Sequence, residues 1–94
     1  MPTRITQTDH KDQSLTVLRV EGSLLIDDAV LIERLCRDIQ ESGTRTIALD
    51  LSGLSFLDSE SASVLWRLKR ERGVEFEGLH LFIQKVIELA EQGK

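Results

Sequence analysis

The residues from Asp58 to Ser61 place two acids and two hydroxyls at the start of a predicted helix. The unpaired N–H groups and partial positive charge of a helix start can accommodate a phosphate on a serine. A phosphoserine at Ser59 would add about −1.5 to −2 charges at neutral pH. This phosphate would lie within about 6 Å of the Asp58 and Glu60 carboxylates, and its repulsion from each of them would amount to roughly 1 to 5 kcal/mol. Phosphorylation of Ser59 could therefore lower the affinity for a docked partner about a hundredfold without a change of fold.

The same residues have a purely structural interpretation. Serine is among the commonest helix caps, Asp58 could itself be the cap, and many domains carry a hydroxyl and an acid at a helix start without any regulation. Ser55, Ser61 and Ser63 are alternative hydroxyls, and Ser63 shares the helix face of Ser59.

One face of the helix that begins at Ser59 carries residues suited to protein binding. At 100° per residue, this face lies away from the apolar stripe and holds Ser59, Ser63, Trp66 and Arg70. Exposed Trp and Arg are favoured anchors at interfaces. This face is either a protein-binding strip, or Trp66 lies at the border of the core and a neighbouring helix covers it.

Rival chemistries find little support in the sequence. A serine hydrolase would need a base near Ser59, but His10 falls in a predicted turn, His80 begins the last predicted helix, and no Gly-x-Ser-x-Gly elbow is present. No His pair or Cys cluster has metal-ligand spacing. A glycine-rich phosphate loop is absent, although "SGL" at 52–54 could touch a phosphate. We expect no catalytic residues, no metal and no cofactor.

Composition restricts the setting. The 94 residues are 40% hydrophobic and favour one compact domain over 1–94. A formal charge of −4 argues against nucleic acid and against an acidic membrane surface as partners. No apolar run approaches the ~20 residues of a membrane span, and the first residues are too polar for a signal peptide. The single Cys36, expected in the core, suits a reducing compartment, so we expect a cytoplasmic protein.

Periodicity predicts the elements that position these residues. We expect a β-hairpin from strands at 3–8 and 14–22, then a helix over 27–43, with Asp27 or Asp28 as its cap and Gly43 as its stop. The inward residues of that helix are predicted to be Ala29, Ile32, Leu35, Cys36 and Ile39.

The second half of the chain is predicted to repeat the alternation of strand and helix. We expect a buried strand at 45–51, a connection at 52–58, a helix from Ser59 to Arg72, a strand at 74–79 and a last helix from roughly His80 to Gln92. The last helix is predicted to face inward with Phe82, Val86, Leu89 and Ala90. The order ββαβαβα favours an α/β domain with a mixed four-stranded sheet covered by helices.

The segment "LDLSGLSFLDS" at 49–59 resembles the pattern of the STAS domain family, in which a hydrophobic strand and a small-residue turn lead to Asp-Ser at a helix start. "VEGSLL" at 20–25 resembles the family's Gly-x-Leu turn, and "FEGLHLFIQKVIELA" at 76–90 resembles its closing strand and helix. The order and spacing of these pieces are more specific than any single piece.

The resemblance implies a regulatory binding module and not an enzyme. In the antagonist branch of the family, a kinase-type anti-sigma factor phosphorylates the serine that follows the aspartate, here Ser59, and the complex then dissociates. The alternative is a cytoplasmic accessory subunit of a lipid or solute transport ATPase without a phospho-switch. The candidate partner-binding residues are Asp27, Asp28, Asp58, Ser59, Glu60, Ser63, Trp66 and Arg70. The oligomeric state stays open.

Two positions depart from the family pattern. Glu60 and Ser61 stand where many members have a small hydroxyl residue and then glycine, so the helix start is stiffer and carries a fixed charge beside Ser59. Leu25 stands where an acid is frequent, and the nearest acids are Asp27 and Asp28.

Overall fold

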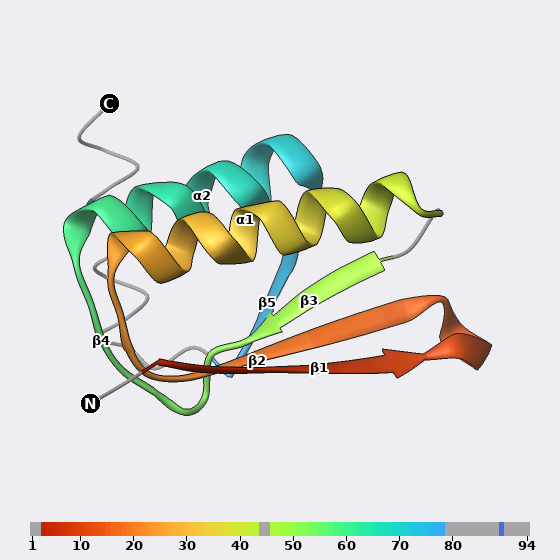
Figure 1. Ribbon diagram of the computed structural model, residues 1–94, viewed down its shortest axis with the longest axis horizontal. Helices are drawn as coiled ribbons and strands as arrows, with labels where there is room; N and C mark the ends of the chain where they lie inside the picture. Colours follow the sequence, from red (N-terminus) through yellow and green to blue (C-terminus); the bar gives the residue numbers. More distant parts are fainter. Residues whose placement is uncertain (1–2, 44–45, 79–88, 90–94) are drawn as a thin grey trace.

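The computed structural model describes residues 3–43, 46–78 and 89, and its two long helices lie side by side over one face of a sheet (Figure 1). The elements in chain order are β1 Arg4–His10, the 3-10 turn η1 Lys11–Gln13, β2 Leu15–Leu24, α1 Ile26–Glu41, β3 Thr46–Asp50, β4 Leu54–Leu57, α2 Ser59–Arg72 and β5 Glu75–Glu77. The predicted α/β class with a mixed sheet is confirmed.

The sheet is built around β2. Strand β1 pairs antiparallel with β2, which confirms the predicted hairpin, whereas β3 and β4 both pair parallel with β2, and β5 pairs parallel with β3. The hairpin is longer than predicted, because Asp9 and His10 continue the ladder opposite Thr16 and Leu15. The chain then turns through η1 and through Ser14, whose φ is 50°.

The segment 52–58, predicted as a connection, contains a fifth strand. Leu54 and Leu57 of β4 are buried, and Ser55 and Phe56 between them are exposed. Four residues are too few for strand periodicity to be recognised, and the preceding Gly53 indicates a turn. Pairing with β2, which becomes irregular after Gly22, makes this segment a strand.

The core lies between the sheet and the two helices. Alternate residues of β2 are fully buried with the inner faces of α1 and α2, including Leu18, Val20, Leu24, Ala29, Ile32, Cys36, Leu65 and Leu68. The inward prediction for α1 is confirmed, with Leu35 and Ile39 half-buried against this core. Burial raises the pKa of the Cys36 thiol to about 11, so the thiol is neutral at physiological pH.

The predicted ends of α1 are wrong. Neither Asp27 nor Asp28 is the cap: the N-cap is Leu25, whose extended backbone passes directly from β2 into the helix. The two aspartates lie in the first turn, and Asp28 accepts a hydrogen bond from the Thr3 hydroxyl at 2.8 Å. The helix ends at Glu41 with Ser42 as its C-cap, and the predicted stop Gly43 follows directly but does not adopt the left-handed φ of a glycine stop.

The predicted bounds of α2 are confirmed. Asp58 is the N-cap, and its Oδ1 accepts a hydrogen bond from the Ser61 N–H at 2.8 Å. The helix stops at Gly73, which adopts φ 67° and donates its N–H to the Leu68 carbonyl. A left-handed glycine is a common end for a helix.

The last part of the chain is described only in part. Strand β5 confirms the core of the predicted strand 74–79. The predicted helix over 80–92, with Phe82, Val86 and Ala90, lies outside the described residues apart from Leu89. Leu89 is helical and 66% exposed, so its inward prediction is wrong: three- and four-residue spacing shows which side chains share a face, but not which face is packed. No helix in the described ranges is long and apolar enough to cross a membrane.

Candidate functional site

The starts of α1 and α2 lie next to each other. Strands β2 and β4 pair in parallel up to Leu24 and Leu57, and each of these residues stands just before a helix start. The Asp58 N–H donates to the Leu24 carbonyl at 3.3 Å and ties the two connections together. The two helices then run in the same direction from this end (left in Figure 1). We call residues 25–28 and 58–61 the paired helix starts.

Four carboxylates gather at the paired helix starts. Asp27 and Asp28 belong to the first turn of α1, Asp58 caps α2, and Glu60 lies in the first turn of α2. Within the described ranges, none of the four forms a salt bridge with a basic group. Acids at helix starts are stabilised by the partial positive charges there. The structure thus brings together the acids that the sequence places about thirty residues apart.

Ser59 is the accessible hydroxyl of this region. Its side chain is exposed in the first turn of α2, and its carbonyl accepts a hydrogen bond from the Ser63 hydroxyl at 3.1 Å. The Ser55 hydroxyl donates to the Gly22 carbonyl at 3.0 Å. Ser61 is fully buried, and no described residue partners its Oγ. A modifying enzyme can therefore reach Ser59 but not Ser61.

Trp66 lies at the border of the core. It is half-buried and packs against the core cluster, and the Lys69 Nζ lies 5.9 Å from the centre of its ring. The same ammonium lies 5.8 Å from the Phe76 ring. Cation–π contacts of this kind contribute about 0.5–1 kcal/mol at exposed sites. Trp66 therefore offers only part of its surface beside Ser63 and the exposed Arg70.

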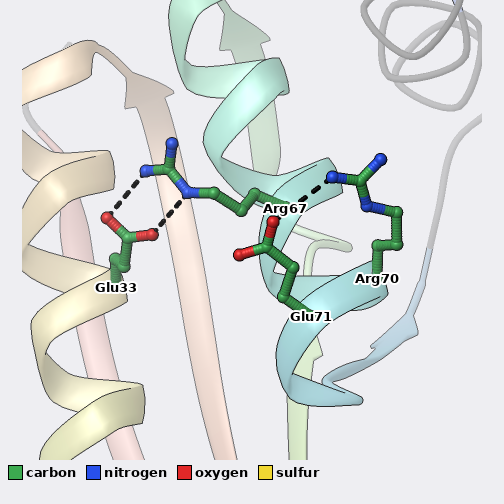
Figure 2. A network of polar contacts seen from close by, with 4 residues as sticks. All are labelled: Glu33, Arg67, Arg70 and Glu71. Atoms are coloured by element: carbon green, nitrogen blue, oxygen red, sulfur yellow. Dashed lines mark hydrogen bonds and ion pairs between the residues drawn. The ribbon is translucent and has the colours of Figure 1, made fainter.

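A bidentate ion pair, which sequence reasoning missed, sets α2 against α1. The Arg67 Nε and Nη2 donate to the two Glu33 carboxylate oxygens at 2.7 and 2.8 Å (Figure 2). The hydrogen bond to Glu33 raises the pKa of Arg67 above its usual value. The two residues are 34 positions apart, and no periodicity or motif connects them.

The turn before β4 is fixed by a second polar cluster that sequence reasoning missed. Asp50 Oδ1 accepts from the Ser52 N–H at 3.0 Å and from its hydroxyl at 2.7 Å. The Ser52 hydroxyl, then its N–H, lower the pKa of Asp50, and Arg19 adds to this effect. Gly78 packs against this turn with φ 67°, and a Cβ there would lie 2.7 Å from the Ser52 Cβ. The cluster fixes the path into β4 and so into the start of α2.

The paired helix starts carry groups suited to the recognition of another molecule. Among the residues that the structure describes, no group of three or more His, Cys, Asp or Glu side chains is arranged to hold a metal ion. His10 lies at the end of β1, whereas Ser59 begins α2. An exposed hydroxyl, four carboxylates and the exposed Leu25 and Phe56 form a surface to which another molecule can bind.

Comparisons with known proteins agree with this architecture. The family model described as "Mlab, STAS domain" matches residues 6–93. No curated protein is similar enough to count as a match. The structure is similar to the anti-sigma factor antagonist SpoIIAA in its unphosphorylated form, with 19% identity and a TM-score of 0.68 over 92% of this chain and 83% of that chain. It is also similar to the antisigma-factor antagonist STAS domain from Rhodobacter sphaeroides, with 23% identity and a TM-score of 0.58 over 81% of this chain and 86% of that chain. Both likenesses show a shared fold.

Proposed function

The chain belongs to the STAS domain family, and on this premise we propose that it is a non-enzymatic, cytoplasmic regulator that binds a kinase-type anti-sigma factor through the paired helix starts. Phosphorylation of Ser59 by that partner switches the interaction off. The observation that carries the proposal is the exposed Ser59 hydroxyl in the first turn of α2, beside the start of α1.

The electrostatics of the site support such a switch. A phosphate on Ser59 would bring about two further negative charges to a surface that already holds Asp27, Asp58 and Glu60. The helix start tolerates the phosphate because its N–H groups and partial charge favour an anion. A protein docked over Ser59 would have to desolvate that charge. Binding is lost while the fold is kept.

The test combines phosphoryl transfer with binding. The protein is incubated with ATP and a purified kinase-type anti-sigma factor from the same source, and intact-mass and peptide analysis locate the modification. We expect one phosphoryl group on Ser59 and none on the Ser59→Ala variant. Ser63→Ala is the matched control, because Ser63 lies on the same face one turn later and already donates to the Ser59 carbonyl.

Calorimetry of the same pair tests the binding surface. Ser59→Asp and Trp66→Ala should each weaken the complex about tenfold or more, because both residues lie on one side of α2. Asp12→Asn, in η1 between the strands of the hairpin, should leave affinity unchanged. Absence of a mass gain on Ser59 together with unchanged affinity of Ser59→Asp would refute this function.

Glu60 supports a second candidate, an accessory subunit of a transport ATPase. This exposed carboxylate in the first turn of α2 provides a permanent negative charge beside Ser59, and the matching family model is described as Mlab rather than as an antagonist. In that role the paired helix starts form a constant interface, and Ser59 needs no modification.

Affinity purification from the native source separates the two candidates. The accessory subunit should co-purify with an ATPase, remain unphosphorylated, and lose that partner on Glu60→Lys. The antagonist should co-purify with a kinase that is released when ATP is added.

A further inference from the structure

The outer face of α1 carries two exposed apolar residues between an acid and a base. Val30 and Leu31, in the first half of the helix, are 43% and 41% exposed. Asp27 precedes them and Arg34 follows them, and both charged side chains are exposed. Neither forms a salt bridge with any described residue. This face therefore offers an apolar centre between opposite charges that pair with none of the described residues.

The spacing of these residues is symmetric. Asp27 and Arg34 are seven residues apart, about two turns, so they lie almost in line on the helix face. They are equally far from the midpoint between Val30 and Leu31. A second α1 laid antiparallel across this midpoint would place each Asp27 opposite an Arg34 of the other copy. Val30 and Leu31 would then meet their own counterparts near the two-fold axis.

The outer face of α2 has the same centre. Leu24 pairs with Leu57 just before the two helices begin, and the Glu33–Arg67 ion pair joins the helices further along, so residues about 33 or 34 positions apart lie near each other in the two helices. The point between Val30 and Leu31 of α1 therefore lies at about the level of Val64 and Leu65 of α2. On the outer face of α2, Ser59 and Arg70 are equally far from this point, and so are Ser63 and Trp66. A single two-fold axis that crosses both helices at these points therefore also places Ser59 opposite Arg70 of the other copy, and Ser63 opposite Trp66.

We propose that a second copy of this chain docks antiparallel on the outer face of α1 and α2. In this dimer Arg34 of one copy lies opposite Asp27 of the other, and Arg70 of one copy lies opposite Ser59 of the other. In this arrangement residues 26–35 of α1 and 59–70 of α2 overlap with their counterparts, and side by side they present a face of about 15–18 Å by 20 Å. Two such faces bury on the order of 700 Å² in total, which suits only a weak, reversible interface.

The dimer would add a second effect to the proposed phosphorylation switch at Ser59, and this part of the proposal rests on the proposed function. It covers Ser59 and therefore competes with partner binding. A phosphate on Ser59 repels an acidic or apolar partner surface, but in the dimer it would face the exposed Arg70 guanidinium of the other copy. Charge-assisted contacts between Arg and phosphate are strong. Phosphorylation should therefore favour the dimer while it releases the partner.

Charge reversal tests the pairing of Asp27 with Arg34. Sedimentation velocity over a concentration series should show a monomer–dimer equilibrium for the wild-type chain. Asp27→Arg should weaken the dimer about tenfold or more, and the double variant with Arg34→Asp should restore it, because the opposite charges then meet again. Asp12→Arg makes the same change of charge in η1, away from the helices, and should have no effect. Circular dichroism establishes that each variant is folded.

A cross-link tests the antiparallel geometry. Val30→Cys should form an intermolecular disulfide under mild oxidation, since the two Val30 positions lie near the axis. Glu41→Cys is the matched control, because the two Glu41 positions would be about 30 Å apart in the antiparallel dimer. The buried native Cys36 stays unreactive. Cross-linking of both variants alike would contradict the antiparallel arrangement.

The dimer is overturned if the wild-type chain remains monomeric at millimolar concentration and Val30→Cys does not cross-link above Glu41→Cys. Failure of the proposed function gives a different result, in which the dimer forms but no kinase binds or modifies Ser59. The link between the two is tested with the phosphorylated chain, which should dimerise at least threefold more tightly than the unmodified chain. Arg70→Gln should remove this gain.

Discussion

At the scale of single residues, the first turn of α2 holds one hydroxyl in solvent and another in the core. Ser61 is fully buried, and its Oγ is unpartnered within the described residues, whereas Ser59 is exposed. A buried hydroxyl without a partner costs about 1–3 kcal/mol. The Ser61 N–H, by contrast, is satisfied by Asp58. The side chain of Ser61 is therefore a local weakness in an otherwise well-capped helix.

Ser61→Ala should raise the free energy of unfolding by about 1 kcal/mol, because it removes a buried, unsatisfied hydroxyl and places a good helix former there. Urea unfolding followed by circular dichroism measures the change. Ser59→Ala is the matched control and should change stability by less than about 0.5 kcal/mol, since its side chain is exposed. A loss of stability in Ser61→Ala would mean that the hydroxyl has a stabilising contact.

Asp50 should make stability depend on acidic pH. Its pKa is lowered in the folded chain by Ser52 and Arg19, so its contribution to stability is fully present above the unfolded pKa of about 4 and is lost as the pH falls from there through the lower folded pKa. Asp50→Asn should reduce stability at pH 7 by about 0.5–1.5 kcal/mol, and the difference from wild type should shrink below about pH 4. Urea unfolding at several pH values, with Asp12→Asn as the control, checks this. A constant difference would show that charge is not the cause.

At the scale of elements, three glycines separate the effect of backbone conformation from that of packing. Gly78 and Gly73 both have φ 67°, but only at Gly78 would a Cβ meet close atoms, those of Ser52 and Asp50. Gly43 has neither constraint. Alanine at Gly73 should cost about 1 kcal/mol, the penalty for a left-handed residue, and alanine at Gly78 should cost more because the turn before β4 must also move. Thermal unfolding of the three variants should rank them as Gly78, Gly73, Gly43; equal losses at Gly78 and Gly73 would contradict the packing argument.

The sequence predicts the long elements well and the short ones poorly. The two helices and β3 have enough residues for a period or an apolar run to be recognised, and Asp58 and Gly73 are ordinary end signals for α2. Strand β4 has only four residues, and it is a strand because β2 lies beside it. The ends of α1 were mispredicted because its cap is made by the backbone at Leu25 rather than by an acid side chain.

The same reasoning explains what could be predicted of the site. Ser59 and Asp58 were found because hydroxyls and acids at a helix start form a local pattern, and the structure confirms their position there. The placement of Asp27 beside them depends on the parallel pairing of β2 and β4, which joins distant segments. The Glu33–Arg67 pair and the Asp50–Ser52 cluster have no sequence signal, since each depends on how elements pack.

At the scale of the whole molecule, Cys36 reports on the integrity of the core. It lies on the inner face of α1, fully buried, and burial raises the pKa of its thiol to about 11. The thiolate is the reactive species, and an unfolded cysteine has a pKa of about 8.5. Native protein should therefore resist a thiol reagent at pH 8, and labelling should follow the urea unfolding curve. Fast labelling before unfolding would show that α1 opens locally. Ser42→Cys, exposed at the end of α1, should react at once and provides the reference rate.

The single O–H of Thr3 is shared between two acceptors, the Ser23 carbonyl and the Asp28 carboxylate. Thr3 is thereby held against the beginning of α1, within a few residues of the surface where a partner would dock. A purification tag or fluorescent protein fused ahead of Thr3 would consequently be attached near that surface, so binding measured with a tag at this end should be repeated with the tag removed.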